Sequence, residues 1–200
     1  MKDAVYMSNL LPGFLDPVLD SQRTFRQVLD AMAHPGRVIP LDTKIQVPRP
    51  LHAATAAVCL TLLDFETSLW MDLDEKSDAA GWLRFHCGCP VVHSPSAARF
   101  GLISRGYGVP ALDQFNPGQD DLPEQSATLI IQVSGLTSGS GKCFRGPGIE
   151  TLERLEVQGL PDDFWMSWHL NQRLYPLGVD VLFTAGSTLV ALPRTTEVEE

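Results

Sequence analysis

The segment from Ala127 to Val133, with the sequence ATLIIQV, constrains the fold most because it is almost continuously apolar. A strand of this kind has no side suited to water and is typical of the middle of a sheet that is covered on both faces. Helical patterns lead the chain and then alternate with strand patterns, and a strand pair ends it. We therefore expect an α/β protein with three layers, α/β/α, around a mixed and mostly covered sheet.

A helix is expected over Ser21–Gly36. Its apolar side chains recur at i, i+3, i+4 and i+7, which predicts a stripe that packs on the core: Phe25, Val28, Leu29 and Met32. Asp20 or Ser21 is expected to cap the first turn, while Pro35 and Gly36 end the helix. Because a charge would then enter the core, Phe25→Asp or Leu29→Asp is expected to unfold the domain.

The remaining elements follow from the same patterns. Further helices are expected at 51–63, 79–86 and from 162 or 163 to 173, with a helical turn at 111–115. Strands are expected at 37–39, 67–73, 97–103, 127–133, 142–145, 152–157, 179–184 and 188–192, with hairpin turns at 139–141 and 185–187. No linker-like stretch divides the chain, so residues 1–200 are expected to form one domain.

The first 16 residues are expected to form an N-terminal arm. Its apolar side chains need a surface to cover: Leu10, Leu11, Phe14 and Leu15. That surface is either the arm's own domain, which we favour, or another subunit.

Charge and hydropathy exclude several classes of protein. The formal net charge of -9 argues against a nucleic-acid binder, which would show a basic patch. The longest apolar run, from Ala53 to Leu63, is much shorter than the ~20 residues of a membrane helix. The N-terminus has no signal-peptide pattern, so we expect a cytoplasmic protein. The four cysteines are expected to be free thiols.

Two sequence patterns that would supply chemistry are incomplete. Gly139-Ser140-Gly141-Lys142 resembles a phosphate-binding loop, but Leu136 stands where the first glycine belongs and Cys143 replaces the hydroxyl residue. Four possible soft metal ligands lie close together, with a spacing that is poor for zinc: His86, Cys87, Cys89 and His93. We therefore expect neither a phosphate loop nor a metal site.

Two further kinds of catalysis are also not expected. Pyridoxal-phosphate chemistry needs a lysine for the Schiff base, and of the four lysines only Lys142 is near a candidate cleft. A Gly-x-Ser-x-Gly nucleophile elbow does not occur in the sequence. No cofactor is expected.

Stretches along almost the whole chain resemble one protein family in the right order. They are Phe25-Arg26-x-x-Leu29-x-Ala31-Met32-x-x-Pro35-Gly36, Leu60-Thr61-Leu62-x-Asp64, Leu83-Arg84-Phe85-His86, Ala127-Thr128-Leu129-Ile130-x-Gln132-Val133, Gly146-x-Gly148-Ile149, Pro176-Leu177-Gly178-Val179-Asp180 and Pro193-Arg194-Thr195-Thr196-x-Val198-Glu199. The family is that of the PhnH subunits of the bacterial carbon-phosphorus lyase system.

The resemblance carries expectations of its own. It implies an architecture like the large fold of pyridoxal-phosphate transferases without the cofactor, and a homodimer when the chain is isolated. It also implies that the chain acts with the other lyase core subunits in transferring the ribose triphosphate of ATP to a phosphonate, displacing adenine, and is inactive alone. The alternative is a stand-alone phosphate-ester or nucleotide-binding enzyme that uses His86 as acid or base.

Polar residues inside these stretches are the candidates for ligand or interface contacts: Arg26, Arg84, His86, Arg194, Thr195 and Thr196. Arginine side chains match phosphate and phosphonate oxygens in a bidentate way. Structural ion pairs are the alternative role, with Asp64, Glu124 and Asp180 as possible partners.

Overall fold

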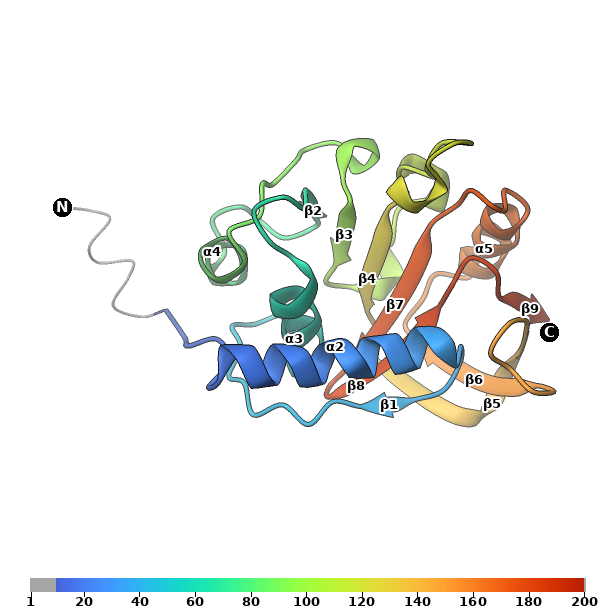
Figure 1. Ribbon diagram of the computed structural model, residues 1–200, viewed down its shortest axis with the longest axis horizontal. Coiled ribbons are helices and arrows are strands. Elements are labelled where there is room, and N and C mark those ends of the chain that lie inside the picture. The colour runs from blue at the N-terminus through green and yellow to red at the C-terminus, as the bar shows by residue number, and fades with distance from the viewer. Residues whose placement is uncertain (1–9, 200) are drawn as a thin grey trace.

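The computed structural model describes residues 10–199 and has a mixed sheet at its centre (Figure 1). The strand order is β1-β8-β7-β4-β3-β2. The strands are β1 (Ile39–Pro40), β2 (Leu69–Met71), β3 (Phe100–Ile103), β4 (Thr128–Gln132), β7 (Asp180–Ala185) and β8 (Thr188–Leu192). Strands β2, β3, β4 and β7 run parallel, and β8 is antiparallel to both β7 and β1. The expected α/β class and mixed sheet are confirmed.

Strand β4 occupies the central place that its composition predicts. It pairs with β3 on one side and with β7 on the other. Leu129, Ile130 and Ile131 are fully buried, and they alternate between the two cores of the protein. Ile130 faces the core on one side of the sheet, while Leu129 and Ile131 face the other, as the twofold period of a strand requires.

Three helices cover one face of the sheet: α2 (Pro17–Ala33), α3 (Ala53–Leu62) and α4 (Asp78–Cys87). Helix α3 is rich in alanine, and its small side chains let it lie buried against α2, α4 and the sheet. The expected buried second helix is confirmed. Helix α4 ends at Gly88, which takes the left-handed conformation that a Cβ would disfavour.

The other face is covered by helix α5 (Phe164–Gln172) together with a second, antiparallel sheet of order β6-β5-β9. Its strands are β5 (Gly135–Arg145), β6 (Glu153–Gln158) and β9 (Glu197–Glu199). The third layer therefore combines strands with one helix, whereas the expected α/β/α arrangement had helices alone there.

The hairpin expected at residues 139–141 is wrong, because β5 continues through them. The register with β6 shifts between Ser138 and Lys142, so the strand bulges and does not turn back. Gly141 has a φ of 79°, and a Cβ on it would lie 2.6 Å from the carbonyl oxygen of Leu155. The glycines thus permit a bulge and a close strand contact.

Short 3₁₀ helices lie in the connections: η2 (Pro95–Ala97), η3 (Gly106–Gly108), η4 (Leu112–Gln114) and η5 (Pro123–Gln125). The helical turn expected at 111–115 corresponds to η4. In residues 10–199 no helix is long and apolar enough to cross a membrane.

Helix α2 begins earlier than expected. Asp16 is the N-cap, and its carboxylate accepts bonds from the backbone N–H groups of Val18 and Leu19 at 3.1 and 3.0 Å. Pro17 occupies the first helical position, where its missing N–H costs nothing. Asp20 and Ser21 therefore lie inside the helix.

The buried face of α2 also differs from the expected one. Thr24, Val28 and Ala31 are buried, whereas Phe25 is 45% exposed and Leu29 is 52% exposed. The apolar period is compatible with both faces, but the small side chains of Thr24 and Ala31 allow the helix to approach α3 and β8 closely. The expectation that Phe25→Asp or Leu29→Asp unfolds the domain is therefore withdrawn.

The N-terminal arm covers its own domain over the part that the structure describes. Leu10, Leu11 and Phe14 pack against the helix-side core. The carbonyl oxygen of Leu11 accepts a bond from Nε1 of Trp82 at 2.8 Å. Leu15 is 81% exposed and contributes nothing to this packing. The first nine residues of the expected arm lie outside the described residues.

Candidate functional site

The carboxyl edge of the parallel strands, where open α/β sheets usually bind ligands, is filled by the side chain of Gln132. Its Oε1 accepts bonds from the backbone N–H of His52 at 2.6 Å and from Oγ1 of Thr55 at 2.8 Å. Its Nε2 donates to the carbonyl oxygens of Pro50 at 2.8 Å and Ser104 at 2.9 Å. All four hydrogen-bonding positions of the amide are thus used inside the protein.

The same network reaches β7 and the β7–β8 turn. The hydroxyl groups of Thr55 and Thr184 are 2.8 Å apart, and both residues are fully buried. Nδ1 of His52 accepts the backbone N–H of Gly186 at 3.1 Å, so it is unprotonated in this bond. Burial lowers the pKa of His52 from its ordinary value. These bonds fix the start of α3 to the sheet.

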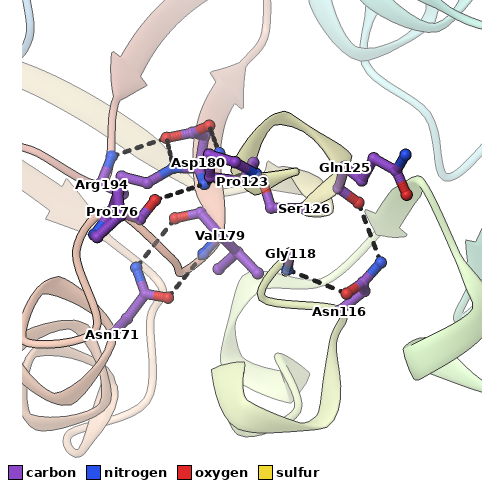
Figure 2. Close-up of polar contacts among 10 residues, drawn as sticks. All are labelled: Asn116, Gly118, Pro123, Gln125, Ser126, Asn171, Pro176, Val179, Asp180 and Arg194. Carbon is purple, nitrogen blue, oxygen red and sulfur yellow. Dashed lines mark hydrogen bonds and ion pairs between the residues drawn. The ribbon is translucent and has the colours of Figure 1, made fainter. Parts of the chain in front are cut away.

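Arg194 lies at the opposite, amino edge of the parallel strands, and Figure 2 shows the bonds that hold its guanidinium. Its Nε and Nη2 donate to the two carboxylate oxygens of Asp180 at 3.1 and 2.5 Å. Nη1 donates to the carbonyl oxygens of Pro123 at 3.0 Å and Pro176 at 3.3 Å, and Nη2 also donates to Oγ of Ser126.

The Arg194–Asp180 pair is the structural ion pair that the sequence offered as an alternative. The side chains are only 13% and 15% exposed, and the backbone N–H of Arg194 also binds Asp180 at 2.8 Å. Because Asp180 begins β7 beside Thr128 of β4, the pair joins the end of the β7–β8 hairpin to the η5 segment. The donors of Arg194 are directed to protein atoms and not to a cleft.

Thr195 and Thr196 follow in the turn before β9. The carbonyl oxygen of Thr196 accepts a bond from Nε1 of Trp168 at 3.1 Å, which ties the turn to α5. Oγ1 of Thr196 is buried without a hydrogen-bond partner among the described residues. A Cβ on Gly146 would lie 3.0 Å from the carbonyl oxygen of Thr195, so these two family stretches are in close contact.

Arg84 and His86 are both on α4 but contact different segments. Arg84 Nη2 donates to the carbonyl oxygen of Glu75. A ring nitrogen of His86 lies 3.0 Å from the carbonyl oxygen of Leu11, and the ring packs against Trp82 with 4.7 Å between centroids. His86 thus holds the arm and is not directed into a cleft.

Arg26 is exposed on α2, distant in sequence from Arg84 and Arg194, and it forms no ion pair within residues 10–199. The six candidates therefore do not converge on one site. Arg194, Thr195 and Thr196 lie together, Arg84 and His86 share a helix, and Arg26 stands alone on the surface.

The four possible metal ligands of the sequence are not brought together either. His93 lies on the surface, 3.5 Å from a carboxylate oxygen of Glu75, while His86 contacts the arm. Cys87 Sγ lies 3.7 Å from the carbonyl oxygen of Cys59. Within the described part of the chain, no group of three or more His, Cys, Asp or Glu side chains is arranged to hold a metal ion.

The cysteines are free and buried, as expected. A hydrogen bond between the thiols of Cys87 and Cys89 raises the pKa of Cys87 and lowers that of Cys89. Burial raises the pKa of the Cys59 thiol. These thiols have little access to reagents in solution.

A cleft of about 600 Å³ lies where the end of α2 meets the connection between β5 and β6. Its lining residues are His34, Pro35, Arg37, Gly148, Ile149, Glu150, Thr151, Leu152 and Glu153. Two stretches of the family resemblance, Pro35-Gly36 and Gly146-x-Gly148-Ile149, therefore meet here although they are far apart in sequence. The sequence analysis did not predict this cleft. The glycines in the two stretches were the signal that could have indicated a close contact here.

Gly148 makes the closest backbone contact in this cleft. Its φ is 84°, and a Cβ on it would lie 2.0 Å from the carbonyl oxygen of Ala33, the last residue of α2. A Cβ on Gly36 would likewise lie 3.0 Å from Glu153. The glycines of both stretches are therefore required for the two segments to pack together.

The cleft carries both signs of charge. His34 Nδ1 lies 3.0 Å from the Asp30 carboxylate, while Arg37 and Glu150 are exposed at the rim. The partial negative charge at the end of α2 does not favour an anion there. The lining of the cleft therefore combines acidic and basic side chains and does not form a single-sign anion site.

Comparison with known proteins agrees with this distribution of the family stretches. The sequence model of the family described as bacterial phosphonate metabolism protein (PhnH) matches residues 12–199. The alpha-D-ribose 1-methylphosphonate 5-triphosphate synthase subunit PhnH of Rhizobium meliloti (strain 1021) is 38% identical over 188 residues, 94% of each chain. The putative C-P lyase subunit protein HtxG of Stutzerimonas stutzeri is 31% identical over 178 residues, 88% of this chain and 85% of that protein. The chain belongs to the PhnH family of bacterial phosphonate metabolism proteins.

Proposed function

We propose that the chain is an accessory subunit of a carbon-phosphorus lyase core complex, needed for transfer of the ribose triphosphate moiety of ATP to an alkylphosphonate. The similarity to a synthase subunit over 94% of both chains supports this role. The partners are the other subunits of that complex. The chain acts in the cytoplasm, as a single domain.

The observation that carries the proposal is the contrast between buried polar groups and exposed apolar ones. Gln132 and Arg194, the best-formed polar centres, use their donors and acceptors on protein atoms. Large apolar side chains instead face outward on two helices in different layers: Val18, Leu19, Phe25 and Leu29 on α2, and Met166 and Leu170 on α5. A subunit that contributes positioning and assembly needs such surfaces, whereas an independent enzyme needs convergent polar groups.

The finer details of the family resemblance belong to the same proposal. We propose that the isolated chain is a homodimer. Exposed apolar side chains of α5, Met166 and Leu170, and of the turn that follows it, Leu174 and Tyr175, are available for the interface. The mixed sheet covered on both faces supports likening the fold to the pyridoxal-phosphate transferases. No cofactor is assigned to it.

Adenine release tests the proposal. The purified chain, given ATP and an alkylphosphonate, should release no adenine, and it should be required when the other subunits are supplied. Full activity of the other subunits without it would overturn the accessory role. Adenine release by the lone chain, abolished by His86→Ala in a folded protein, would instead support the stand-alone enzyme.

A further inference from the structure

The outward face of α2 carries a stripe of side chains that no other described element covers. We call it the α2 stripe; it comprises Val18, Gln22, Phe25 and Leu29, flanked by Leu15, Leu19 and Arg26. Val18 is 75% exposed, and Phe25 and Leu29 are about half exposed. Figure 1 shows α2 at the front of the molecule, with none of the described elements drawn over it.

The spacing of the α2 stripe is that of a helix-pairing seam. Its residues are four, three and four positions apart, the pattern by which two helices pack side by side at a small crossing angle. Thr24, Val28 and Ala31 hold the opposite side of α2 against α3 and β8, so the helix cannot turn to bury the stripe. The stripe therefore fits an apolar helix that comes from outside this fold.

The charges beside the stripe distinguish between a second copy and a different protein. Arg26 is next to Phe25 and has no ion-pair partner in residues 10–199. The acidic side chains of the α2 region are already engaged in their own helix. Asp16 caps it, Asp20 lies 3.4 Å from Arg23, and Asp30 lies 3.0 Å from His34.

An α2-to-α2 pair would therefore bring Arg26 no free carboxylate. A different partner that carries its own acidic residue at this point would supply that carboxylate.

We propose that the α2 stripe docks an amphipathic helix of another subunit of the lyase complex, and that a carboxylate of that helix pairs with Arg26. The inference rests on the proposed function and names the surface through which it operates. Phe25 and Leu29 are the apolar anchors, since both project from the middle of the stripe. The positive charge of Arg26 requires an acidic side chain at the facing position of the partner helix.

Hydroxyl-radical footprinting of the wild-type protein tests this without any substitution. In the isolated chain, Phe25 should be labelled about as readily as Phe85, which is 57% exposed. In the complex co-expressed with the other lyase subunits, labelling of Phe25 and Leu29 should fall at least fivefold. Unchanged labelling in an assembled complex would overturn the inference.

Substitution provides the second measurement. Phe25→Asp should raise the dissociation constant for the other subunits by about 30-fold or more, the effect of losing a buried anchor. Tyr107→Asp is the matched control, because Tyr107 is a 66% exposed aromatic side chain on η3, outside the α2 stripe. Arg26→Glu should weaken binding by about tenfold and Arg26→Lys by much less. Circular dichroism of each variant verifies that it is folded.

The outcomes separate this inference from the proposed function. If the wild-type chain does not join the other subunits, the proposed function fails and the docking surface with it. If the wild type joins and folded Phe25→Asp joins equally well, only the docking surface is rejected. If Phe25 is already protected in the isolated chain, a second copy or the chain's own first nine residues cover the α2 stripe, and the inference is also rejected. A dimer-to-monomer change in Phe25→Asp would identify the second copy.

Discussion

The guanidinium of Arg194 donates two parallel hydrogen bonds to the carboxylate of Asp180, and both side chains are mostly shielded from water. Removing the arginine side chain would leave the carboxylate buried without its counter-charge. Arg194→Ala is therefore expected to lower the free energy of unfolding by about 3–5 kcal/mol, measured by urea denaturation. Arg26→Ala, on the surface, should change it by no more than about 0.5 kcal/mol. Equal effects of the two would mean that the Arg194 pair is not structural.

Two neighbouring residues of α2 test which face is buried. Val28 is 5% exposed and Leu29 is 52% exposed. Val28→Asp should unfold the protein or lower its melting temperature severely, because the charge enters the helix-side core. Leu29→Asp should keep the stability within about 0.5 kcal/mol of the parent, as most surface changes do. Calorimetry of both variants decides, and the reverse order of melting temperatures would mean that the helix is rotated.

Gly148 and Gly139 form a matched pair of glycines with almost the same backbone conformation. Their φ angles are 84° and 82°, but a Cβ would meet Ala33 only at Gly148, and nothing lies within 4 Å at Gly139. Gly139→Ala should cost about 1 kcal/mol from its backbone alone. Gly148→Ala should cost a further 1–3 kcal/mol, roughly, from the clash. Chemical denaturation measures the difference, and equal costs would show that the α2 end and the β5–β6 connection are not in close contact.

His52 is expected to make stability depend on acid pH. In the folded state its pKa is below the ordinary value of 6.5. The contribution of neutral His52 to the free energy of unfolding is therefore complete above pH 6.5 and is lost as the pH falls from there through the lowered pKa. Protonation also removes the acceptor for Gly186 and places a positive charge at the start of α3. The urea concentration at the unfolding midpoint should therefore decrease as the pH is lowered from 7 to 5.

A matched pair of variants isolates this effect. His52→Asn, which does not titrate, should flatten the dependence of the urea midpoint on pH. His93→Asn, which changes a surface histidine beside Glu75, should leave it unaltered. An unchanged slope in His52→Asn would assign the acid sensitivity to other groups.

Local patterns predicted most elements of the fold, because their signals lie within a few residues. The continuous apolar run of β4 and the alanine-rich sequence of α3 both indicated burial, and both segments are buried. The rotation of α2 was not predictable, since two apolar faces overlap on that helix and only packing against α3 and β8 selects one. The bulge in β5 was missed because glycines permit either a turn or a bulge, and pairing with β6 over the whole strand decides between them.

The candidate site was less predictable than the fold. Sequence offered Asp180 as a partner for an arginine, and the structure pairs it with Arg194. The role of Gln132 could not be inferred, because its four partners lie in two segments, at 50–55 and at Ser104, that are distant from it in sequence. The cleft beside Gly148 is likewise formed by residues more than a hundred positions apart, so only the three-dimensional structure brings them together.

The antiparallel pairing of β1 with β8 has a consequence for the order in which the chain acquires its structure. Ile39 pairs with Leu189. This edge of the sheet can therefore form only after almost the entire chain has been synthesised. On the ribosome, α2 emerges long before β8, against which it packs. Contacts between such distant residues slow folding because a long loop must close before they form. We therefore expect newly made chains to expose the part of α2 that packs on β8 until synthesis is nearly complete.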